Sequence, residues 1–433
     1  MKKTPCAALA LFFLVTCARP GQAPEAPAAK PPAASAGDKA SAQAGLESSE
    51  VTSLARAIAG ELTLEEKCAQ LLMLAAGTQT HIPRALAKTL AEVPAGAVLL
   101  LGYNIAENAE DIMRFTSALQ DIALSRSLGI PFFIAVDHEG GSVYRFGDTA
   151  TRLPGASRVG ELLEGGTGEE EIEALYRNAA RQLSLLGFSL NLAPVLEARG
   201  AENRGFLTTR TYSESPLTVS RAGGLVLKAM RETGVLAAAK HFPGTGDADP
   251  HSVLPRLSPR AASPGSPGLQ PFSEAVFSQG LAALMLSHAA APGFDTELPV
   301  TLSARVQQGF LRETLGFRGI ILTDDINMKA LTHDRAPEEA AVMAVAAGAD
   351  MIMYLDEYAP RVRDALANAV KEGLLPETRV EEAAVRIIEE KLRLGLWLKT
   401  RDLAGRSLDT RREEFRLLKE EGDALAASLV SRK

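Results

Sequence analysis

The stretch GIILTDD at residues 319–325 is a short apolar run that ends in two carboxylates. Similar short apolar runs recur along the chain, and longer amphipathic stretches separate most of them. They cover residues 71–77, 95–102, 131–137, 188–196, 235–242, 281–289, 319–325 and 349–356. Nearly continuous apolar runs predict strands that are buried on both faces, and helical connections predict parallel pairing of these strands.

The intervening stretches carry helical periodicity and complete a repeated pattern of strand and helix. We expect helices at residues 105–127, 169–186, 216–233, 303–315 and 335–347. This pattern fits an open doubly wound sheet or a closed barrel, but no G-x-G-x-x-G turn follows the first strand. Eight repeats favour the barrel, so the sequence predicts an α/β protein with a TIM-like (β/α)8 barrel.

The N-terminal stretch MKKTPCAALALFFLVT at residues 1–16 has a basic start and an apolar run that is too short to span a bilayer. This arrangement is typical of an export signal. The sequence LVTC at residues 14–17 is similar to the lipobox of bacterial lipoproteins, which implies acylation of Cys17. We therefore expect an exported periplasmic or cell-surface lipoprotein, with ordinary secretion or an uncleaved anchor as alternatives.

Three segments follow the leader. Residues 17–50 are dominated by Ala, Pro, Ser and Gly without any aromatic residue, which predicts a disordered linker. Residues 54–398 contain the eight repeats and are expected to form one catalytic domain. Residues 399–433 carry apolar positions at roughly helical spacing, so we expect a helical tail that packs on the barrel or on a partner.

The net charge of -7 argues against nucleic acid or an anionic surface as the main partner. Contact with a membrane is expected only through a lipid at Cys17, and the protein is expected to be a monomer. Cys68 follows a predicted capping box from Thr63 to Glu66 and is expected to be a small core residue.

Polar residues gather where the predicted strands end. Asp137 ends the third run, Lys240 and His241 end the fifth, and Asp324 ends the seventh. In a (β/α)8 barrel these carboxyl ends form the active site. A single such residue is more often structural, but polar residues at the ends of several strands predict one shared pocket.

The sequence lacks the motifs that are typical of metal sites, phosphate-binding loops and serine hydrolases. No H-x-x-x-H, H-x-H or C-x-x-C spacing occurs, and Lys240 would place a cation in the pocket, so neither a metal nor another cofactor is expected. The PGTGD stretch at residues 243–247 lacks the G-K-[ST] ending of a phosphate-binding loop, and no G-x-S-x-G is present.

Carboxylate-centred cleavage of a sugar acetal fits these residues better. Asp324 is placed to act as a nucleophile, and a second group must protonate the leaving oxygen. Asp249 and His251 lie two residues apart on the loop behind the fifth run, where the carboxylate can orient and charge the imidazole. An Asx turn, in which Asp249 binds nearby backbone, is the structural alternative for this spacing.

KHFPGTGDADPHSVLP at residues 240–255 resembles K-H-F-P-G-H-G followed by D-S-H-x-x-L-P in bacterial β-N-acetylhexosaminidases of glycoside hydrolase family 3. The resemblance extends from about residue 60 to about residue 395. It includes FFIAVDHEGGSVYRF (132–146), LLGFSLNLAPVLE (185–197) and LPVTLSARVQQGFLRETLGFRGIILTDDINMKAL (298–331). It implies a barrel enzyme that removes terminal β-linked N-acetylglucosamine, from peptidoglycan fragments or other glycans, with retention and without a metal.

The resemblance also implies a role for individual residues. Asp324 matches the nucleophile, His251 the acid/base and Asp249 the carboxylate that assists it. The matched substrate ligands are Asp137, Arg145, Arg210, Lys240 and His241. Asp325 is expected to be structural because consecutive strand side chains point to opposite faces.

The sequence departs from the family pattern at a few positions, which are occupied here by His138, Ser142, Glu197 and Thr245. The loop from Gly246 to His251 is about two residues shorter than usual, which could slow acid catalysis. The first expectation is a retaining exo-β-N-acetylglucosaminidase. The alternatives are a β-glucosidase or β-xylosidase of the same family and a non-catalytic surface lipoprotein that binds a sugar or a partner.

Overall fold

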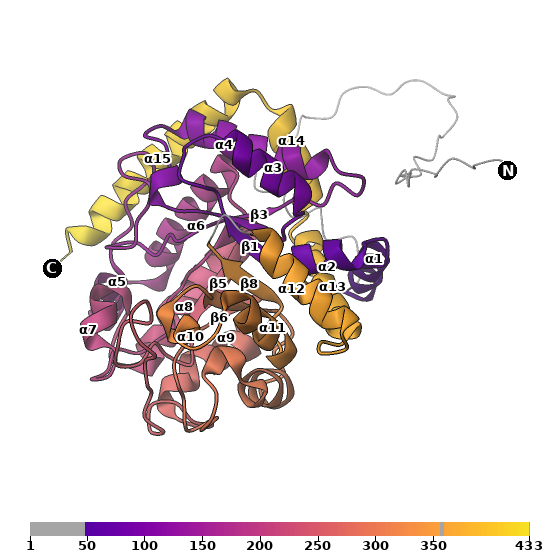
Figure 1. Cartoon of the computed structure of the whole chain (residues 1–433). Helices are drawn as coiled ribbons and strands as arrows, with labels where there is room; N and C mark the ends of the chain where they lie inside the picture. The colour runs from indigo at the N-terminus through magenta and orange to yellow at the C-terminus, as the bar shows by residue number, and fades with distance from the viewer. Residues whose placement is uncertain (1–47, 356–358, 433) are drawn as a thin grey trace, which may run out of the picture. The chain divides into compact units, whose positions relative to one another are not determined.

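The protein forms a closed barrel of eight parallel strands, which a computed structural model describes over residues 48–355 and 359–432 (Figure 1). The strands follow one another around the barrel in chain order. They are β1 Leu72–Ala75, β2 Ala97–Leu100, β3 Phe133–Val136, β4 Leu190–Asn191, β5 Leu236–Phe242, β6 Ala283–Leu286, β7 Ile320–Asp325 and β8 Met351–Tyr354. The predicted fold class is therefore confirmed.

Pairing of the first and last strands closes the sheet, with Leu72 opposite Ile352 and Leu74 opposite Tyr354. Every residue of β2, β3, β5, β6 and β8 is buried. These strands face the barrel interior on one side and helices on the other, which explains their nearly continuous apolar sequences.

Helices cover the outside of the barrel. Before β5 they are α1 Ser48–Gly60, α2 Leu64–Gln70, α3 Arg84–Glu92, η2 Gly102–Asn104, α4 Ala109–Leu124, α5 Ala156–Glu164, α6 Glu169–Leu186, α7 Arg204–Leu207, η3 Thr208–Arg210 and α8 Pro216–Thr233. After β5 they are η4 Pro267–Leu269, α9 Gln270–Phe277, η5 Val300–Leu302, the π-helix η6 Arg305–Thr314, α10 Lys329–Thr332, α11 Pro337–Ala347, α12 Ala359–Lys371, α13 Glu377–Arg393, α14 Leu396–Gly405 and α15 Leu408–Val430. No helix of the described residues is long and apolar enough to cross a membrane.

The N-terminal boundary of the folded region differs from the prediction. The leader, Cys17 and most of the expected linker lie outside the described residues, but residues 48–50 begin α1 and are not linker. Val51, Ala55 and Ala59 are buried in this helix, which packs against α13. Their small apolar side chains give a weak periodic signal, and burial against α13 stabilises the helix.

The C-terminal segment packs on the barrel, which is one of the two arrangements expected from the helical spacing of its apolar residues. Phe415, Leu418 and Leu429 on α15 are buried, and this helix lies against α6 and α4. The expected boundary between residues 398 and 399 was wrong, because it falls inside α14. Packing of α14 against α4 and α13 makes it continuous with the barrel.

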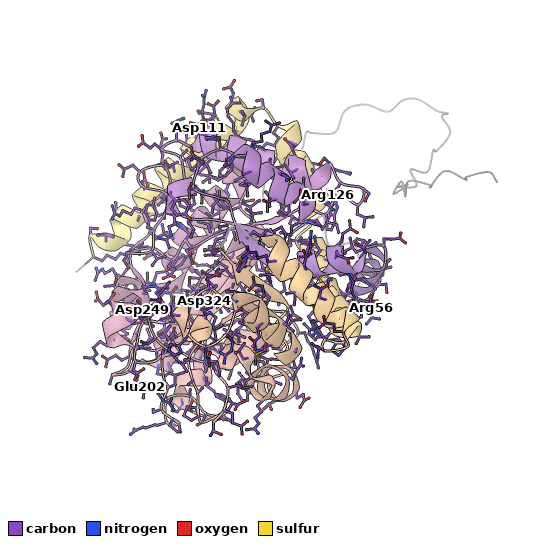
Figure 2. The ribbon with its side chains drawn as sticks, viewed as in Figure 1. Arg56, Asp111, Arg126, Glu202, Asp249 and Asp324 are labelled. Carbon is purple, nitrogen blue, oxygen red and sulfur yellow. The ribbon has the colours of Figure 1, made fainter. Side chains whose placement is uncertain are left out.

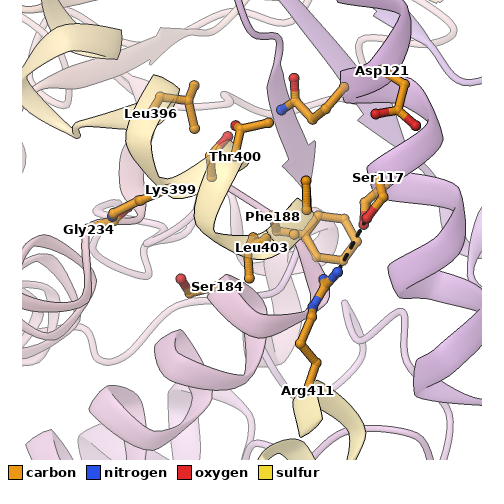
Figure 3. Close-up of a pocket in the computed structure, with 15 residues that line it drawn as sticks. Ser117, Asp121, Ser184, Phe188, Gly234, Leu396, Lys399, Thr400, Leu403 and Arg411 are labelled. Carbon is orange, nitrogen blue, oxygen red and sulfur yellow. Dashed lines mark hydrogen bonds between the residues drawn. The ribbon is translucent and has the colours of Figure 1, made fainter. Parts of the chain in front are cut away.

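A small pocket separates α14 and α15 from the amino end of β4 (Figure 3). Two cations of the C-terminal segment bind carbonyl groups where helices end beside this pocket. Lys399 Nζ donates to Gly234 O at 2.6 Å, and Arg411 Nη2 donates to Leu185 O at 2.7 Å. Gly234 directly follows α8, and Leu185 lies in the last turn of α6. The two cations therefore bind carbonyl oxygens that have no hydrogen-bond donor within their own helix.

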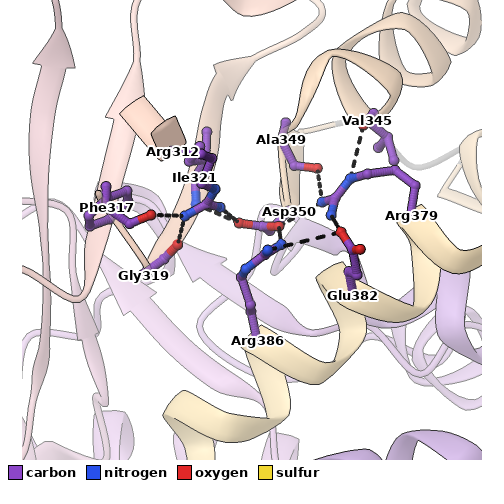
Figure 4. A network of polar contacts seen from close by, with 10 residues as sticks. All are labelled: Arg312, Phe317, Gly319, Ile321, Val345, Ala349, Asp350, Arg379, Glu382 and Arg386. Carbon is purple, nitrogen blue, oxygen red and sulfur yellow. Dashed lines mark hydrogen bonds and ion pairs between the residues drawn. The ribbon is translucent and has the colours of Figure 1, made fainter. Parts of the chain in front are cut away.

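One buried carboxylate gathers three arginines at the amino ends of β7 and β8 (Figure 4). Asp350 is fully buried and accepts hydrogen bonds from Arg312, Arg379 and Arg386 at 2.5, 2.6 and 2.9 Å. It also accepts from the main-chain N–H of Ile321 at 2.9 Å. The cluster joins η6, α13 and the start of β8 at the end of the barrel opposite the strand carboxyl ends.

Candidate active site

The predicted pocket residues lie at the carboxyl ends of their strands. Asp137 follows β3, Lys240 and His241 belong to the end of β5, and Asp324 belongs to the end of β7. All strands are parallel, so these residues share one end of the barrel.

Lys240 connects two carboxylates of the segment after β3. Its Nζ lies 2.6 Å from Asp137 Oδ1 and 2.7 Å from Glu139 Oε1. Arg210 donates from Nε and Nη2 to the two oxygens of Glu139 at 2.9 and 2.8 Å. Arg145 lies 3.6 Å from Asp137 Oδ2. Four of the five predicted substrate ligands, Asp137, Arg145, Arg210 and Lys240, therefore form one connected cluster around Glu139.

The buried members of this cluster are charged. Burial opposes ionisation of Glu139, but Lys240 and Arg210 outweigh it and lower the pKa of this carboxyl to about 2. Burial also disfavours the ammonium of Lys240, yet Asp137 and Glu139 raise its pKa. Three cations against two carboxylates leave the cluster with a net positive charge, which suits binding of electron-rich hydroxyl groups.

Asp324 is a half-buried carboxylate that is kept ionised by its surroundings. Burial alone would raise its pKa, but the charges of His288 and His241 and the main-chain N–H of Asp325 lower it. The N–H of Asp325 donates to Asp324 Oδ1 at 2.8 Å. An ionised carboxylate with few fixed hydrogen bonds is the state that a nucleophile requires.

The neighbouring Asp325 holds the backbone, as predicted. Its Oδ1 accepts from the main-chain and side-chain N–H groups of Asn327 at 3.1 and 2.9 Å. Its main-chain oxygen lies 3.0 Å from His288 Nε2, and His288 Nδ1 lies 2.7 Å from Thr301 Oγ1. Burial lowers the pKa of His288, and its Nε2 donates to the Asp325 carbonyl. These contacts fix the end of β7 behind Asp324.

Glu197 contacts both His241 and the start of the loop after β5. His241 Nδ1 lies 2.8 Å from Glu197 Oε1, and Thr245 N–H donates to Glu197 Oε2 at 2.7 Å. The Thr245 hydroxyl also donates to Oε2 at 3.0 Å. All three side chains are buried.

Asp249 and His251 form the expected dyad. His251 Nδ1 lies 2.8 Å from Asp249 Oδ1, and the His251 main-chain N–H donates to the same oxygen at 3.0 Å. The side-chain contact with His251 and then its backbone contact lower the pKa of Asp249. The dyad and the Asx turn are therefore present together, because one carboxylate oxygen serves both. The two side chains are 48% and 64% exposed, so the imidazole can reach a ligand from solvent.

Backbone hydrogen bonds hold the loop that carries the dyad. Asp247 Oδ1 accepts from Arg256 N–H at 2.9 Å, which joins the two ends of the loop. Pro250 O accepts from Ala330 N–H at 3.0 Å, which ties its tip to α10 behind β7. Figure 2 shows Asp249 and Asp324 in the same region of the molecule, away from Arg56 and Arg126.

Glu139 and the role of Glu197 were missed from the sequence. Both are carboxylates a few residues beyond predicted strand ends, which was the available signal. Within residues 48–355 and 359–432, no group of three or more Asp, Glu, His or Cys side chains could hold a metal ion.

Known proteins resemble this chain over the barrel. Residues 63–389 match the glycosyl hydrolase family 3 N-terminal domain. A β-hexosaminidase of Thioalkalivibrio sulfidiphilus is 33% identical over 63% of this chain and 77% of its own length. β-Hexosaminidase A of Pseudoalteromonas piscicida is 27% identical over 73% of this chain, which spans only 56% of that protein.

A solved structure agrees with these sequence relatives. The family 3 β-N-acetylglucosaminidase of Paenibacillus sp. str. FPU-7 superposes with a TM-score of 0.72 at 29% identity. The match covers 82% of this chain and 68% of that chain. Because the family match extends over most of the chain and includes every residue of the site described above, the chain belongs to glycosyl hydrolase family 3.

Proposed function

We propose that the protein is a retaining exo-β-N-acetylglucosaminidase. The observation that carries this proposal is an ionised Asp324 at the end of β7 with an Asp249–His251 dyad on a loop bound to the segment behind the same strand. A retaining glycosidase needs such a nucleophile and a separate acid that becomes a base.

In the first step, an Asp324 oxygen attacks the anomeric carbon while protonated His251 donates its Nε2 proton to the leaving oxygen. The carbon–oxygen bond to the leaving group breaks, and a glycosyl ester forms on Asp324. Asp249 holds Nδ1 of the ring and stabilises its positive charge before transfer.

In the second step, neutral His251 removes a proton from water, and the water oxygen attacks the anomeric carbon. The ester bond breaks, Asp324 regains its charge, and His251 is again protonated. The cluster of Asp137, Arg145 and Lys240, with His241, binds sugar hydroxyls and orients the ring. Arg210 donates two hydrogen bonds to Glu139, so it also holds the carboxylate that Lys240 contacts.

The preference for an N-acetylated sugar is supported by the names of the relatives, which include β-hexosaminidases and a β-N-acetylglucosaminidase. We propose terminal N-acetylglucosamine on peptidoglycan-type or other glycan fragments as substrate, and a monomeric enzyme. We also propose export and acylation at Cys17, which a metabolic lipid label tests with Cys17→Ser as the control.

The experiment compares chromogenic β-N-acetylglucosaminide and β-glucoside with the full chain, its Asp324→Asn variant and its His251→Ala variant. We expect cleavage of the N-acetylglucosaminide by the wild type and loss of that activity in Asp324→Asn. Loss of the acid lowers the rate by about 10²- to 10⁴-fold. Preference for the glucoside would contradict the proposed specificity for N-acetylglucosamine. Sugar binding without turnover would contradict the proposal that the protein is an enzyme.

The covalent step has its own test. A slow fluorosugar substrate should label Asp324, which peptide mass spectrometry identifies. Labelling of any other residue would refute the assignment of Asp324 as the nucleophile.

A further inference from the structure

Glu197 accepts hydrogen bonds from two different parts of the site, one with each carboxylate oxygen. Oε1 faces His241 of the sugar pocket, and Oε2 faces Thr245 at the start of the loop that leads to His251. We propose that Glu197 is a positioning residue that orients His241 and fixes the origin of the acid/base loop. This inference rests on the proposed function, because it assigns a role within that reaction.

The contact with His241 selects how this ring is presented. With Nδ1 donating to Glu197 Oε1 at 2.8 Å, Nε2 is the ring nitrogen that Glu197 leaves for other partners. A carboxylate on one ring nitrogen fixes both the tautomer and the rotation of a histidine. The main-chain N–H of His241 also points toward Oε1, at 3.4 Å. Glu197 therefore holds the ring so that Nε2 can meet a sugar hydroxyl.

The contact with Thr245 acts on the loop. Oε2 accepts from the Thr245 main-chain N–H at 2.7 Å and from its hydroxyl at 3.0 Å. Thr245 precedes His251 by six residues, and the intervening segment carries Asp249. Fixing both donors of Thr245 restricts the directions in which the rest of the loop can extend.

Glu197 is itself held rigidly. The segment after β4 pairs with β5, since Lys240 N–H donates to Pro194 O at 3.0 Å and Leu196 N–H donates to Lys240 O at 2.7 Å. Glu197 is 3% exposed. Burial opposes ionisation, but the contacts with His241 and Thr245 outweigh it and lower the pKa of Glu197, so it is a carboxylate at neutral pH.

The need for two acceptors separates Glu197 from a residue that only fills space. A glutamine has one carbonyl oxygen and one amide nitrogen, so it can accept on only one of the two sides. In Glu197→Gln, either His241 or Thr245 would face a donor instead of an acceptor. Glu197→Asp keeps both acceptors and the charge on a side chain that is one methylene shorter.

The experiment measures kcat and KM on two aryl β-N-acetylglucosaminides, with phenol and 2,4-dinitrophenol as leaving groups. Only the phenyl glycoside depends strongly on protonation of its leaving oxygen. We expect Glu197→Gln to lose about 10- to 100-fold in kcat/KM on the phenyl glycoside and clearly less on the dinitrophenyl glycoside. Glu197→Asp should recover most of this loss.

Two further variants resolve the parts of the proposal. Thr245→Val removes only the hydroxyl contact, so it should reproduce the dependence on leaving group more weakly and without a change in the His241 ring. Glu173→Gln is the matched control, because Glu173 is also a buried, ion-paired carboxylate but lies on α6 and contacts Arg177 and Lys228. Glu173→Gln should leave kcat and KM for both glycosides unchanged per folded molecule.

A measurement that does not need activity completes the test. ¹⁵N NMR of the histidine rings, with the His241 signal assigned through His241→Asn, should show Nδ1 protonated in the wild type and a changed tautomer in Glu197→Gln. Equal behaviour of Glu197→Gln and Glu173→Gln on both glycosides, with an unchanged His241 tautomer, would overturn the proposal. If the wild type cleaves no glycoside, the proposed function fails, and the tautomer alone decides whether Glu197 orients His241.

Discussion

The main-chain N–H of Ala330 donates to the carbonyl of Pro250 at 3.0 Å. Pro250 lies between the two members of the dyad, and Ala330 lies six residues after Asp324. One backbone hydrogen bond therefore links the loop that carries the proposed acid to the segment that follows the proposed nucleophile.

Replacing Ala330 by proline removes this donor at the second position of α10, where the helix itself does not use the N–H. We expect kcat/KM to fall by about 10- to 100-fold for a substrate with a poor leaving group, because the dyad is less well placed. Steady-state kinetics on phenyl and dinitrophenyl glycosides measure the effect. Ala330→Gly keeps the N–H and should retain activity; an equal loss in both variants would show that the hydrogen bond is unimportant.

The acid side of the pH profile should reflect the low pKa of Asp324. The carboxylate loses its charge only when pH falls through this lowered pKa, so it stays ionised below the ordinary aspartate value of about 3.9. His241→Gln removes one of the groups that lower the pKa of Asp324, so the acid limb of kcat/KM should move to higher pH. His333→Gln, at an exposed residue, should leave the limb in place. No movement in His241→Gln would exclude His241 as a cause of the lowered pKa.

Lys391 should make stability depend on pH. Its Nζ is fully buried, 3.0 Å from Gln70 Oε1 and 5.3 Å from the centre of the Phe133 ring, and burial lowers its pKa to about 7. A lysine in the unfolded chain has a pKa of about 10.4. Between pH 7 and this value, the unfolded chain therefore binds a proton that the native protein does not bind. Its contribution to the free energy of unfolding therefore rises with pH across this window.

Lys391→Met should abolish that contribution. The difference in free energy of unfolding between wild type and variant should change by about 1.4 kcal/mol per pH unit within the window, as measured by urea titration at pH 8 and pH 9. Lys88→Met, at an exposed residue of α3, is the control. A difference that is constant with pH would mean that Lys391 stays protonated in the native protein.

The arginine cluster at the opposite end of the barrel should matter for stability alone. Asp350→Asn leaves Arg312, Arg379 and Arg386 close together without their common carboxylate, which should cost about 3–5 kcal/mol of unfolding free energy. The molecules that remain folded should keep normal kcat and KM. Arg386→Gln, whose side chain is partly exposed, should cost much less; an equally large cost would contradict the importance of burial.

The barrel could be predicted from local sequence because local signals and tertiary structure agree. The predicted limits of α6 and α8 are those of the structure, since Gly187 and Gly234 end them in the left-handed conformation and Pro216 opens α8. The fourth run was predicted to span residues 188–196, but only Leu190 and Asn191 form β4. Pro194 has no N–H to donate to a neighbouring strand, which limits regular pairing beyond it.

The site was predictable only in part. Strand ends and the D-x-H spacing identified Asp137, Lys240, His241, Asp324 and the dyad, whereas Arg145 and Arg210 were expected only from the family resemblance. They did not identify Glu139 or the double role of Glu197, because such roles depend on which side chains meet across different strands. Lys240 was expected as a substrate ligand, but only the structure shows that it also binds Glu139 at 2.7 Å.

Close contact between α15 and α6 has a consequence for chimeric proteins. A Cβ atom at Gly422 would lie 2.4 Å from side-chain oxygens of Asn178 and Thr151, so the two helices match each other at atomic distance. Exchange of the barrel between homologues without residues 396–430 would also strip the Leu185 and Gly234 carbonyls of their cationic donors. A chimeric protein should therefore take the barrel and residues 396–430 from the same homologue.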